Sequence, residues 1–175
     1  MREIPGVCGV HVMAYRQEEL AALMMHDSDA FVRWEAAQSL AQREILENVD
    51  RLAAGREPRL GEHLLAASRR LLADENSDPA LVAEALTLPD EEYLGEQMPV
   101  IDVDGIHAAR EFVRAELAQA LADRWLQRYR DLANDSPYEK SSQSMARRSL
   151  RNVCLSYLLR TQSGPDLAQA QLSES

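Results

Sequence analysis

Apolar residues recur at steps of three or four along most of the chain, and this spacing constrains the fold more than any other feature. The clearest run places these side chains on one helical face: Ile106, Ala109, Val113, Leu117, Leu121, Trp125, Tyr129 and Leu132. An earlier run repeats the pattern: Phe31, Trp34, Ala37, Ala41, Ile45, Val49 and Leu52. Residues three or four apart share one face of an α-helix, so each run predicts one long amphipathic helix.

Start and stop signals divide the rest of the chain into further helices. Ser28 or Asp29 is placed to cap the helix that runs to Gly55, because either side chain can accept from the free N–H groups of a first turn. Asp78 is placed to cap another helix, whose first position, Pro79, has no N–H group to satisfy. The remaining apolar spacing predicts helices at residues 17–26, at 64–72, from 146 to near Gly164-Pro165, and from 166 onward, with one further turn within 89–99.

These segments together predict an all-α fold. We expect an irregular array of about seven or eight antiparallel helices, similar to an α–α superhelix, because short connections favour antiparallel neighbours. No strict repeat period is present, so a consensus solenoid is not indicated. Residues 5–15, "PGVCGVHVMAY", alternate weakly and predict a short strand or an extended arm. We divide the chain into an extended arm over 1–16, which would suit the remnant of a preceding β domain, and a partial helical domain over 17–175.

The charge of the chain argues against two classes of main partner. The net charge is −10 and the isoelectric point is about 4.9, whereas nucleic acids and anionic membranes select basic surfaces. No apolar run approaches the ~20 residues of a membrane span, and the N-terminus has no stretch typical of a signal peptide. Cys8 and Cys154 form no local metal or redox pair and are expected to be reduced thiols. These features predict a cytoplasmic protein without a nucleic-acid or membrane partner.

One short segment, "EQMPVIDVDGIHAARE" at residues 96–111, contains the residue types of a metal site. Asp102 and Asp104 resemble the start of a calcium loop, and His107 with Glu111 has the i,i+4 spacing of a zinc pair. If the loop began at Asp102, however, its glycine would fall two positions too early for a calcium loop. Two ligands do not make a zinc site. We therefore interpret the segment as a helix start that Asp104 caps, with no metal.

The other histidines and the serines show no catalytic pattern. His11, His26 and His63 lie outside any His-Glu-x-x-His motif, and no positioned partner can be named for them. The serines of "EKSSQSMARRS" follow no Gly-x-Ser-x-Gly turn and read as a polar helix start, and the glycines form no phosphate-binding loop. The residues alone thus predict no catalytic, cofactor-binding or metal-binding residue in this chain, and no cofactor.

Three arginines in "ARRSLR" have a spacing that suits anion binding. Arg147 and Arg151 lie one helical turn apart and Arg148 lies beside them. Because the chain has 29 acidic residues, we favour instead ion pairs with acids on neighbouring helices. The sequence leaves the affinity of these arginines for anions open.

Three segments together resemble a known family. They are "SDAFVRWEAAQSL" at 28–40, "DPALVAEALTLPDEEYLGEQMPVIDVDGIHAARE" at 78–111 and "RRSLRNVCLSYL" at 147–158. Their order and spacing are similar to those in bacterial aminopeptidase N, a zinc metallopeptidase family, within the first part of its C-terminal helical domain. The likeness covers roughly residues 17–172, and three segments in register are more specific than any one of them.

The resemblance implies a parent enzyme that removes N-terminal amino acids from peptides. It implies zinc held by His-Glu-x-x-His and a downstream glutamate, and a Gly-Ala-Met-Glu-Asn segment that binds the substrate amino terminus, all in a separate catalytic domain. Neither motif occurs here, so no catalytic or zinc-binding position is carried over and the chain alone is expected to be inactive. The implied role is a structural, access-controlling cap of the active-site cavity, with the catalytic domain as partner. Whether the chain is excised from a larger protein or comes from a truncated gene stays open.

Two further hypotheses concern partners. A stand-alone helical scaffold that binds a partner protein through an apolar groove is the alternative to the domain fragment. Loss of later helices also predicts an exposed apolar face near Val153 and Tyr157, and such faces tend to self-associate. We therefore expect a homodimer.

Overall fold

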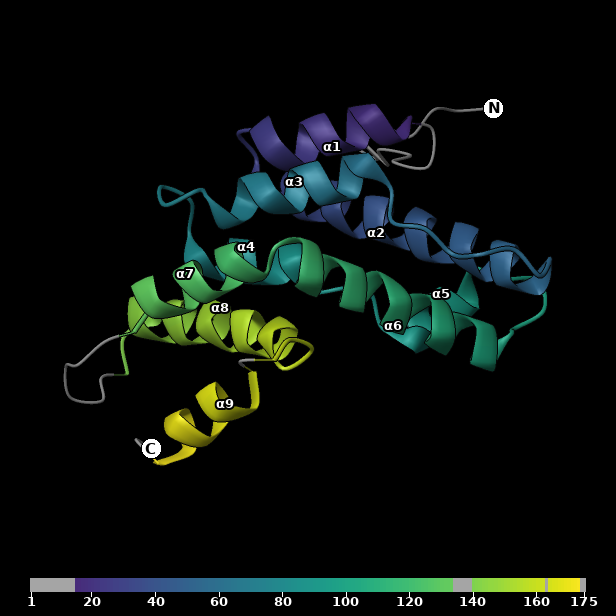
Figure 1. The fold of residues 1–175 in the computed structure, drawn as a ribbon. Coiled ribbons are helices and arrows are strands. Elements are labelled where there is room, and N and C mark those ends of the chain that lie inside the picture. The colour runs from purple at the N-terminus through teal and green to yellow at the C-terminus, as the bar shows by residue number, and fades with distance from the viewer. Residues whose placement is uncertain (1–14, 134–139, 163, 174–175) are drawn as a thin grey trace, which may run out of the picture.

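Residues 15–133, 140–162 and 164–173 are described by the computed structural model, and all of their regular structure is helical (Figure 1). The helices are, in chain order, α1 (Gln17–His26), α2 (Ala30–Ala53), α3 (Glu62–Leu72), α4 (Pro79–Leu86), α5 (Glu91–Glu96), α6 (Val103–Ala120), α7 (Ala122–Asp131), α8 (Ser142–Leu158) and α9 (Gly164–Ser173). The all-α prediction is confirmed. The arm predicted over 1–16 lies, apart from its last two residues, outside the described part and stays a prediction.

The helix boundaries follow the capping residues that the sequence indicates. Asp29 caps α2 by accepting from Phe31 N at 2.8 Å, and Asp78 caps α4 by accepting from Ala80 N at 2.9 Å. Beyond the end of α2, Gly55 has a φ of +66°, which a residue with a Cβ rarely adopts. Local sequence therefore sets where these helices start and stop.

The long helix predicted from Ile106 to Leu132 is two helices. The chain breaks at Leu121, where φ is −119° and ψ is 20°, so that α6 ends and α7 begins on either side of it. Apolar spacing continues through the break, which is why periodicity alone predicts one helix. The indole Nε1 of Trp125 donates to Leu117 O across the break at 3.0 Å. With the α5 turn, this break brings the described helices to nine instead of seven or eight.

The helices enclose one continuous apolar core. α1 packs against α2 and α3, α2 also contacts α6, and α4 contacts α8. α7 and α8 lie side by side and run in opposite directions (Figure 1). Trp125 is fully buried in this core, and its ring stacks on that of Tyr157 with centroids 4.2 Å apart. Packing of the amphipathic faces, not helix propensity, supplies most of the stability of such an array.

The prediction of an exposed apolar face around Tyr157 is wrong. Tyr157 is 3% exposed, because it stacks on Trp125 and its hydroxyl donates to Leu86 O at 2.8 Å. Val153 is half-buried and packs against the core. Leu159, just after α8, is 48% exposed, but the larger exposed apolar group lies at the start of α6, where Val100, Ile101 and Val103 are each more than half exposed.

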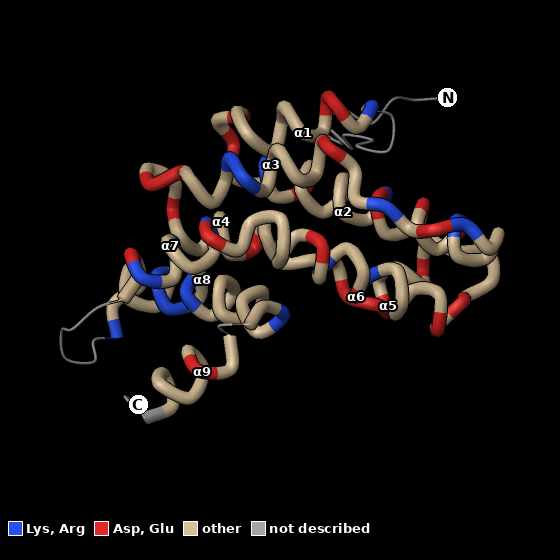
Figure 2. Tube along the Cα trace, viewed as in Figure 1, with Lys and Arg blue, Asp and Glu red and all other residues tan. Residues whose placement is uncertain are grey.

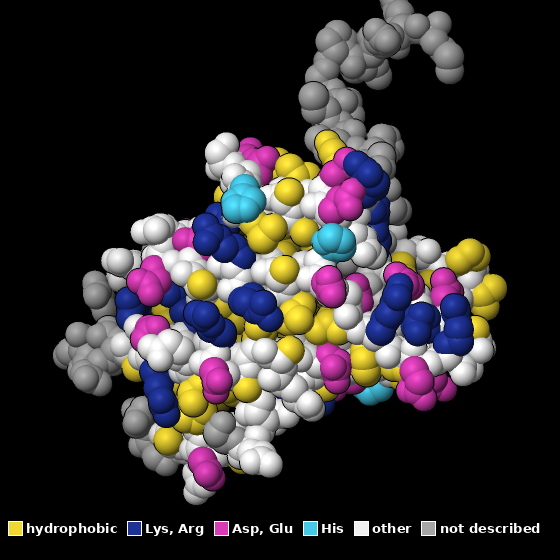
Figure 3. Space-filling view, turned by 45° about the horizontal axis from the view of Figure 1, so that its top comes forward, with side chains coloured by type: hydrophobic (Ala, Val, Ile, Leu, Met, Phe, Trp, Pro, Cys, Tyr) yellow, Lys and Arg dark blue, Asp and Glu magenta, His cyan; other side chains and the backbone are white. Residues whose placement is uncertain are grey.

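Charge is distributed unevenly along the trace. Arginines gather on α7 and the first half of α8, and acidic residues are spread over the other helices (Figure 2). On the face seen in Figure 3, acidic and basic side chains are interspersed with apolar ones. No helix in the described ranges is both long enough and apolar enough to cross a bilayer.

Candidate functional site

The segment at 96–111 forms a helix start, with a different cap from the one predicted. Asp102, not Asp104, is the N-cap of α6, and its Oδ1 accepts from Gly105 N at 2.9 Å. A Cβ at Gly105 would collide with the Asp102 carboxylate, so glycine permits this close approach. Asp104 lies in the first turn, where its charge meets the positive end of the helix.

His107 and Glu111 do not act as a pair. His107 Nδ1 lies 2.9 Å from Glu91 Oε1 on α5, with the imidazole well exposed. Glu111 turns toward three arginines instead. Within the described residues, no group of three histidine, cysteine or carboxylate side chains could hold a metal ion.

The remaining sequence candidates are spread over the molecule. His26 ends α1 and His63 lies in the first turn of α3, whereas His11 and Cys8 lie outside the described residues. Ser141 caps α8 by accepting from Ser144 N at 3.2 Å, which confirms the polar helix start. Cys154 is buried, and burial raises the pKa of its thiol to about 12, so it stays protonated and unreactive near neutral pH.

The ion pairs predicted for Arg147 and Arg151 are absent from the described part of the chain. Arg147 donates to the Asp131 carbonyl at 3.2 Å. Arg151 lies over the Tyr129 ring at 4.6 Å and donates to the Tyr129 hydroxyl at 3.2 Å. Arg148 donates to Ser144 Oγ at 2.6 Å, among other contacts. For Arg147 and Arg151, one backbone carbonyl and the ring and hydroxyl of Tyr129 thus take the place that we assigned to acids.

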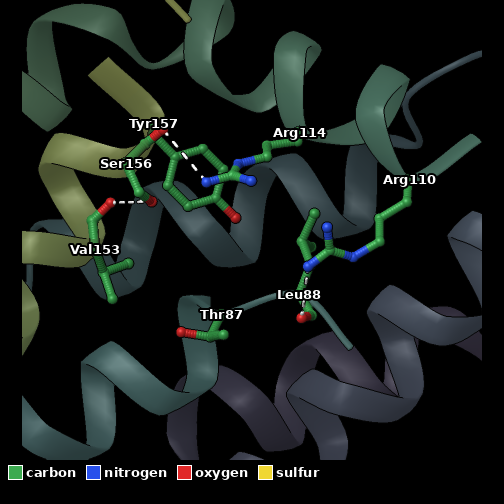
Figure 4. Close-up of a pocket in the computed structure, with 7 residues that line it drawn as sticks. All are labelled: Thr87, Leu88, Arg110, Arg114, Val153, Ser156 and Tyr157. Carbon is green, nitrogen blue, oxygen red and sulfur yellow. Dashed lines mark hydrogen bonds between the residues drawn. The ribbon is translucent and has the colours of Figure 1, made fainter. Parts of the chain in front are cut away.

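A different pair of arginines lines a small hollow between three parts of the fold. The hollow has a volume of about 70 Å³, and Figure 4 shows α6, α8 and the α4–α5 connection around it. Its lining residues are Thr87, Leu88, Arg110, Arg114, Val153, Ser156 and Tyr157. Arg110 and Arg114 lie one turn apart on α6, so both side chains leave the same face of the helix.

Arg110 fixes one wall of the hollow. Its Nε donates to Pro89 O at 2.7 Å and its Nη2 to Leu88 O at 3.5 Å. These carbonyls belong to the connection between α4 and α5, where no helical N–H group is available to them. Arg110 therefore ties α6 to that connection, mainly through the short hydrogen bond from Nε to Pro89 O.

Arg114 is held more loosely. Its Nη2 reaches Ser156 O at 3.5 Å and its Nη1 lies 3.9 Å from Glu111 Oε1. Its guanidinium carbon lies 5.9 Å from the centre of the Tyr157 ring, within the range of a cation–π contact. A guanidinium has five N–H donors, so most of the donors of Arg114 are not used by close partners.

The charges around the hollow do not cancel. Glu111 is the acid in contact with Arg110, Arg114 and Arg160, and its closest contact is the one between Oε2 and Arg160. Three arginines thus share one carboxylate in a chain whose net charge is −10. Burial raises the pKa of Tyr157, so its hydroxyl stays neutral and adds no negative charge. The hollow offers a positive, partly apolar environment, and its lining holds no activated nucleophile or proton shuttle.

Sequence reasoning missed this hollow. A signal was present in "REFVR" at 110–114, where two arginines one turn apart flank the apolar face of the predicted helix. The Ser156 and Tyr157 wall could not be foreseen, because only the packing of α8 against α4 brings it to α6.

Comparison with known proteins shows which family this chain belongs to. Residues 17–175 match the family described as "Domain of unknown function (DUF3458_C) ARM repeats". The chain belongs to this family of helical repeat domains. It is also 37% identical to "Aminopeptidase N" of Haemophilus influenzae over 89% of this chain, and 41% identical to "Aminopeptidase N" of Escherichia coli over 82%.

The solved structure of Legionella pneumophila aminopeptidase A in complex with aspartic acid is similar as well. Its TM-score is 0.75 at 25% sequence identity, over 90% of this chain and 19% of that one. The chain spans only 18% and 16% of the two curated relatives named above. The resemblance to the helical part of aminopeptidase N is thereby confirmed.

Proposed function

We propose that this chain is a structural and access-controlling helical segment of an aminopeptidase N-like enzyme of the cytoplasm. The observation that carries the proposal is the match of 89% of the chain to 18% of an aminopeptidase N. In the intact enzyme the segment would help to enclose the active-site cavity and would rest on the catalytic domain. An apolar surface for such a contact is offered at the start of α6 by the exposed side chains of Val100, Ile101 and Val103.

Zinc belongs to the proposed parent enzyme, and the residues described here do not fit it. A catalytic zinc site needs three protein ligands and an open position. No three suitable side chains converge within 15–133, 140–162 and 164–173. No step of a peptidase mechanism is therefore assigned to this chain, whose contribution would be shape and support.

A chimera tests the proposal. The matching segment of the E. coli aminopeptidase N would be replaced by residues 17–172 of this chain, and hydrolysis of an aminoacyl anilide and zinc content would be measured. We expect the chimera to keep zinc and activity, and the same enzyme with the segment deleted to lose activity. A chimera that retains zinc but is inactive would contradict the supporting role. Turnover by the 175-residue chain alone with added zinc would also contradict it.

A stand-alone scaffold is the second candidate, because the exposed apolar turn before α6 would equally suit an unrelated partner protein. A pull-down from native lysate separates the two functions. Recovery of an aminopeptidase catalytic domain supports the enzyme segment. Stoichiometric recovery of one unrelated protein, lost when Ile101 is changed to Asp, supports the scaffold.

A further inference from the structure

We infer that the hollow between α6, α8 and the α4–α5 connection binds a carboxylate group carried on a short aliphatic stem. This inference concerns a site that the proposed function does not use, so it stands or falls independently. It rests on the convergence of two guanidiniums, their local charge excess and the apolar part of the lining.

The two guanidiniums converge on one region of space. Arg110 Nη1 and Arg114 Nη1 lie 4.0 Å and 3.9 Å from the same atom, Glu111 Oε1. Both contacts are too long for strong hydrogen bonds. Both arginines line the hollow, whereas Glu111 does not. A small anion in the hollow could therefore accept from the N–H donors that Arg110 and Arg114 do not commit to their close partners.

Glu111 does not neutralise this region. Its other oxygen contacts Arg160, closer than either pocket arginine approaches Glu111. Arg160 follows the end of α8 and does not line the hollow. The carboxylate is thus directed mainly to a third arginine, and a positive excess remains at Arg110 and Arg114. In a partly buried setting such an excess attracts an anion more strongly than it would in bulk water.

The shape and lining favour a carboxylate over a larger oxyanion. A guanidinium and a carboxylate are both planar and pair through two parallel N–H···O bonds. The hollow, at about 70 Å³, has room for only a few heavy atoms. Leu88, Val153 and the Tyr157 ring supply apolar walls for the carbon stem (Figure 4). Phosphate would place at least one charged oxygen against these walls, at a desolvation cost.

The test is a titration of the 175-residue chain followed by NMR at constant ionic strength. Propionate is the probe, propionamide its neutral control and inorganic phosphate its oxyanion control. We expect saturable shifts of the Arg114 Nε–Hε signal and of the Ser156 and Tyr157 amides with propionate. Phosphate should bind several-fold more weakly, and propionamide should not saturate. Absence of saturation with propionate, or equal affinity for phosphate, would overturn the assignment.

Variants tie the binding to the hollow. Arg114→Gln should weaken propionate binding at least about tenfold, because it removes a charged donor. Arg124→Gln removes the same charge from an exposed site on α7 and should leave binding unchanged. Arg114→Lys keeps the charge but loses the planar fork and should bind with intermediate affinity. Equal weakening by Arg114→Gln and Arg124→Gln would show a general charge effect and refute the site.

The same titration identifies the source of the carboxylate. A free metabolite-like acid is represented by propionate, and the side chain of another polypeptide segment by acetyl-aspartyl amide. Tighter binding of propionate supports a free small acid, and tighter binding of the aspartyl probe supports an acidic side chain that docks from outside the described residues. If neither probe saturates in the folded wild-type chain, the hollow is not a carboxylate site.

Discussion

Tyr157 shows at the residue scale how one side chain joins several helices. It lies on α8, stacks on Trp125 of α7 and donates its hydroxyl to the Leu86 carbonyl at the end of α4. Burial raises the pKa of this phenol, so the hydroxyl remains a donor at any ordinary pH. The hydrogen bond also satisfies one of the carbonyls that a helix end leaves free.

Tyr157→Phe is therefore expected to lower the free energy of unfolding by about 1–3 kcal/mol, since the buried Leu86 carbonyl loses its described donor. Urea denaturation followed by circular dichroism measures the change. Tyr93→Phe is the matched control, because the Tyr93 hydroxyl bonds to Gln42 at 3.2 Å but the residue is 43% exposed. An equal loss in both variants would show that burial of the hydroxyl is not the deciding factor.

Glu44 is a second residue whose surroundings change its pKa. It is 4% exposed on α2, and its carboxylate accepts from Gly61 N at 2.6 Å. Burial raises the pKa of this carboxyl above its ordinary value of 4.5, against the opposing effect of the Gly61 bond, and the nearby charge of Glu47 adds to the rise. The folded protein consequently binds the Glu44 proton more tightly than the unfolded chain does.

The raised pKa of Glu44 makes the stability of the folded protein depend on pH. Because the folded-state pKa is raised, ionisation of Glu44 costs stability, and this cost grows as the pH rises through and above 4.5. We expect the wild type to lose stability relative to Glu44→Gln as the pH rises through 4.5 and until it has passed the raised pKa of the folded state. Urea midpoints of both proteins across this range provide the measurement. A difference that stays constant with pH would mean that Glu44 ionises equally easily in both states.

At the scale of elements, the break between α6 and α7 organises the second half of the molecule. The backbone leaves the helical conformation at Leu121, and the Trp125 indole bridges the break by donating to Leu117 O. Trp125 is 0% exposed. One side chain thus contributes core volume and a hydrogen bond to the helix end at the same place.

Trp125→Phe is expected to lower the free energy of unfolding by about 2 kcal/mol, because it removes ring volume from the core and leaves the indole bond unmade. Trp34→Phe, at a site that is 36% exposed on α2, should cost less than about 0.5 kcal/mol. Thermal and urea unfolding of the two variants give the comparison. Similar losses of unfolding free energy in the two variants would contradict a special contribution of Trp125 at the break between α6 and α7.

α9 differs from the other long helices in how little it buries. Gly164 is buried, but residues 165–172 are half-buried or exposed, and the helix rests on α8 (Figure 1). Few buried apolar contacts allow local opening at low cost. We expect amide hydrogens in α9 to exchange much faster than those in α8 by mass spectrometry. Equal protection of the two helices would show that α9 is an integral part of the core.

At the scale of the whole molecule, a single core coexists with a separate exposed apolar turn. The helices share one contiguous set of buried side chains. The turn before α6 instead presents Val100 at 81% and Ile101 at 60% exposure. Surfaces of this kind commonly mark sites of association.

The homodimer expected from the sequence stays a prediction, but the surface assigned to it changes. With Tyr157 buried, the apolar turn is the better candidate contact. Sedimentation and light scattering should show a dimer at moderate concentration, and Val100→Asp should shift it toward monomer by adding charge to the contact. A clean monomer of the wild type at high concentration would contradict the prediction.

The sequence predicts the elements well where the signal is local. Asp29, Pro79 and Gly55 act within one turn of the chain, so the ends of α2 and the start of α4 could be read directly. The break at Leu121 could not, because apolar spacing runs through it. The contacts of Arg147 and Arg151 were also misjudged, since a count of acids does not show which groups face an arginine.

From the sequence alone it could be predicted that the described part of the chain is helical, where most of its helices begin and end, and which family it resembles. Each of these follows from periodicity, capping or motif order within short stretches. The burial of Tyr157 and the meeting of Arg110 and Arg114 with the wall of α8 became clear only from the packed helices. The physical reason is that burial and charge pairing depend on which helices pack together, and residues 40 or more positions apart carry no local sign of that contact.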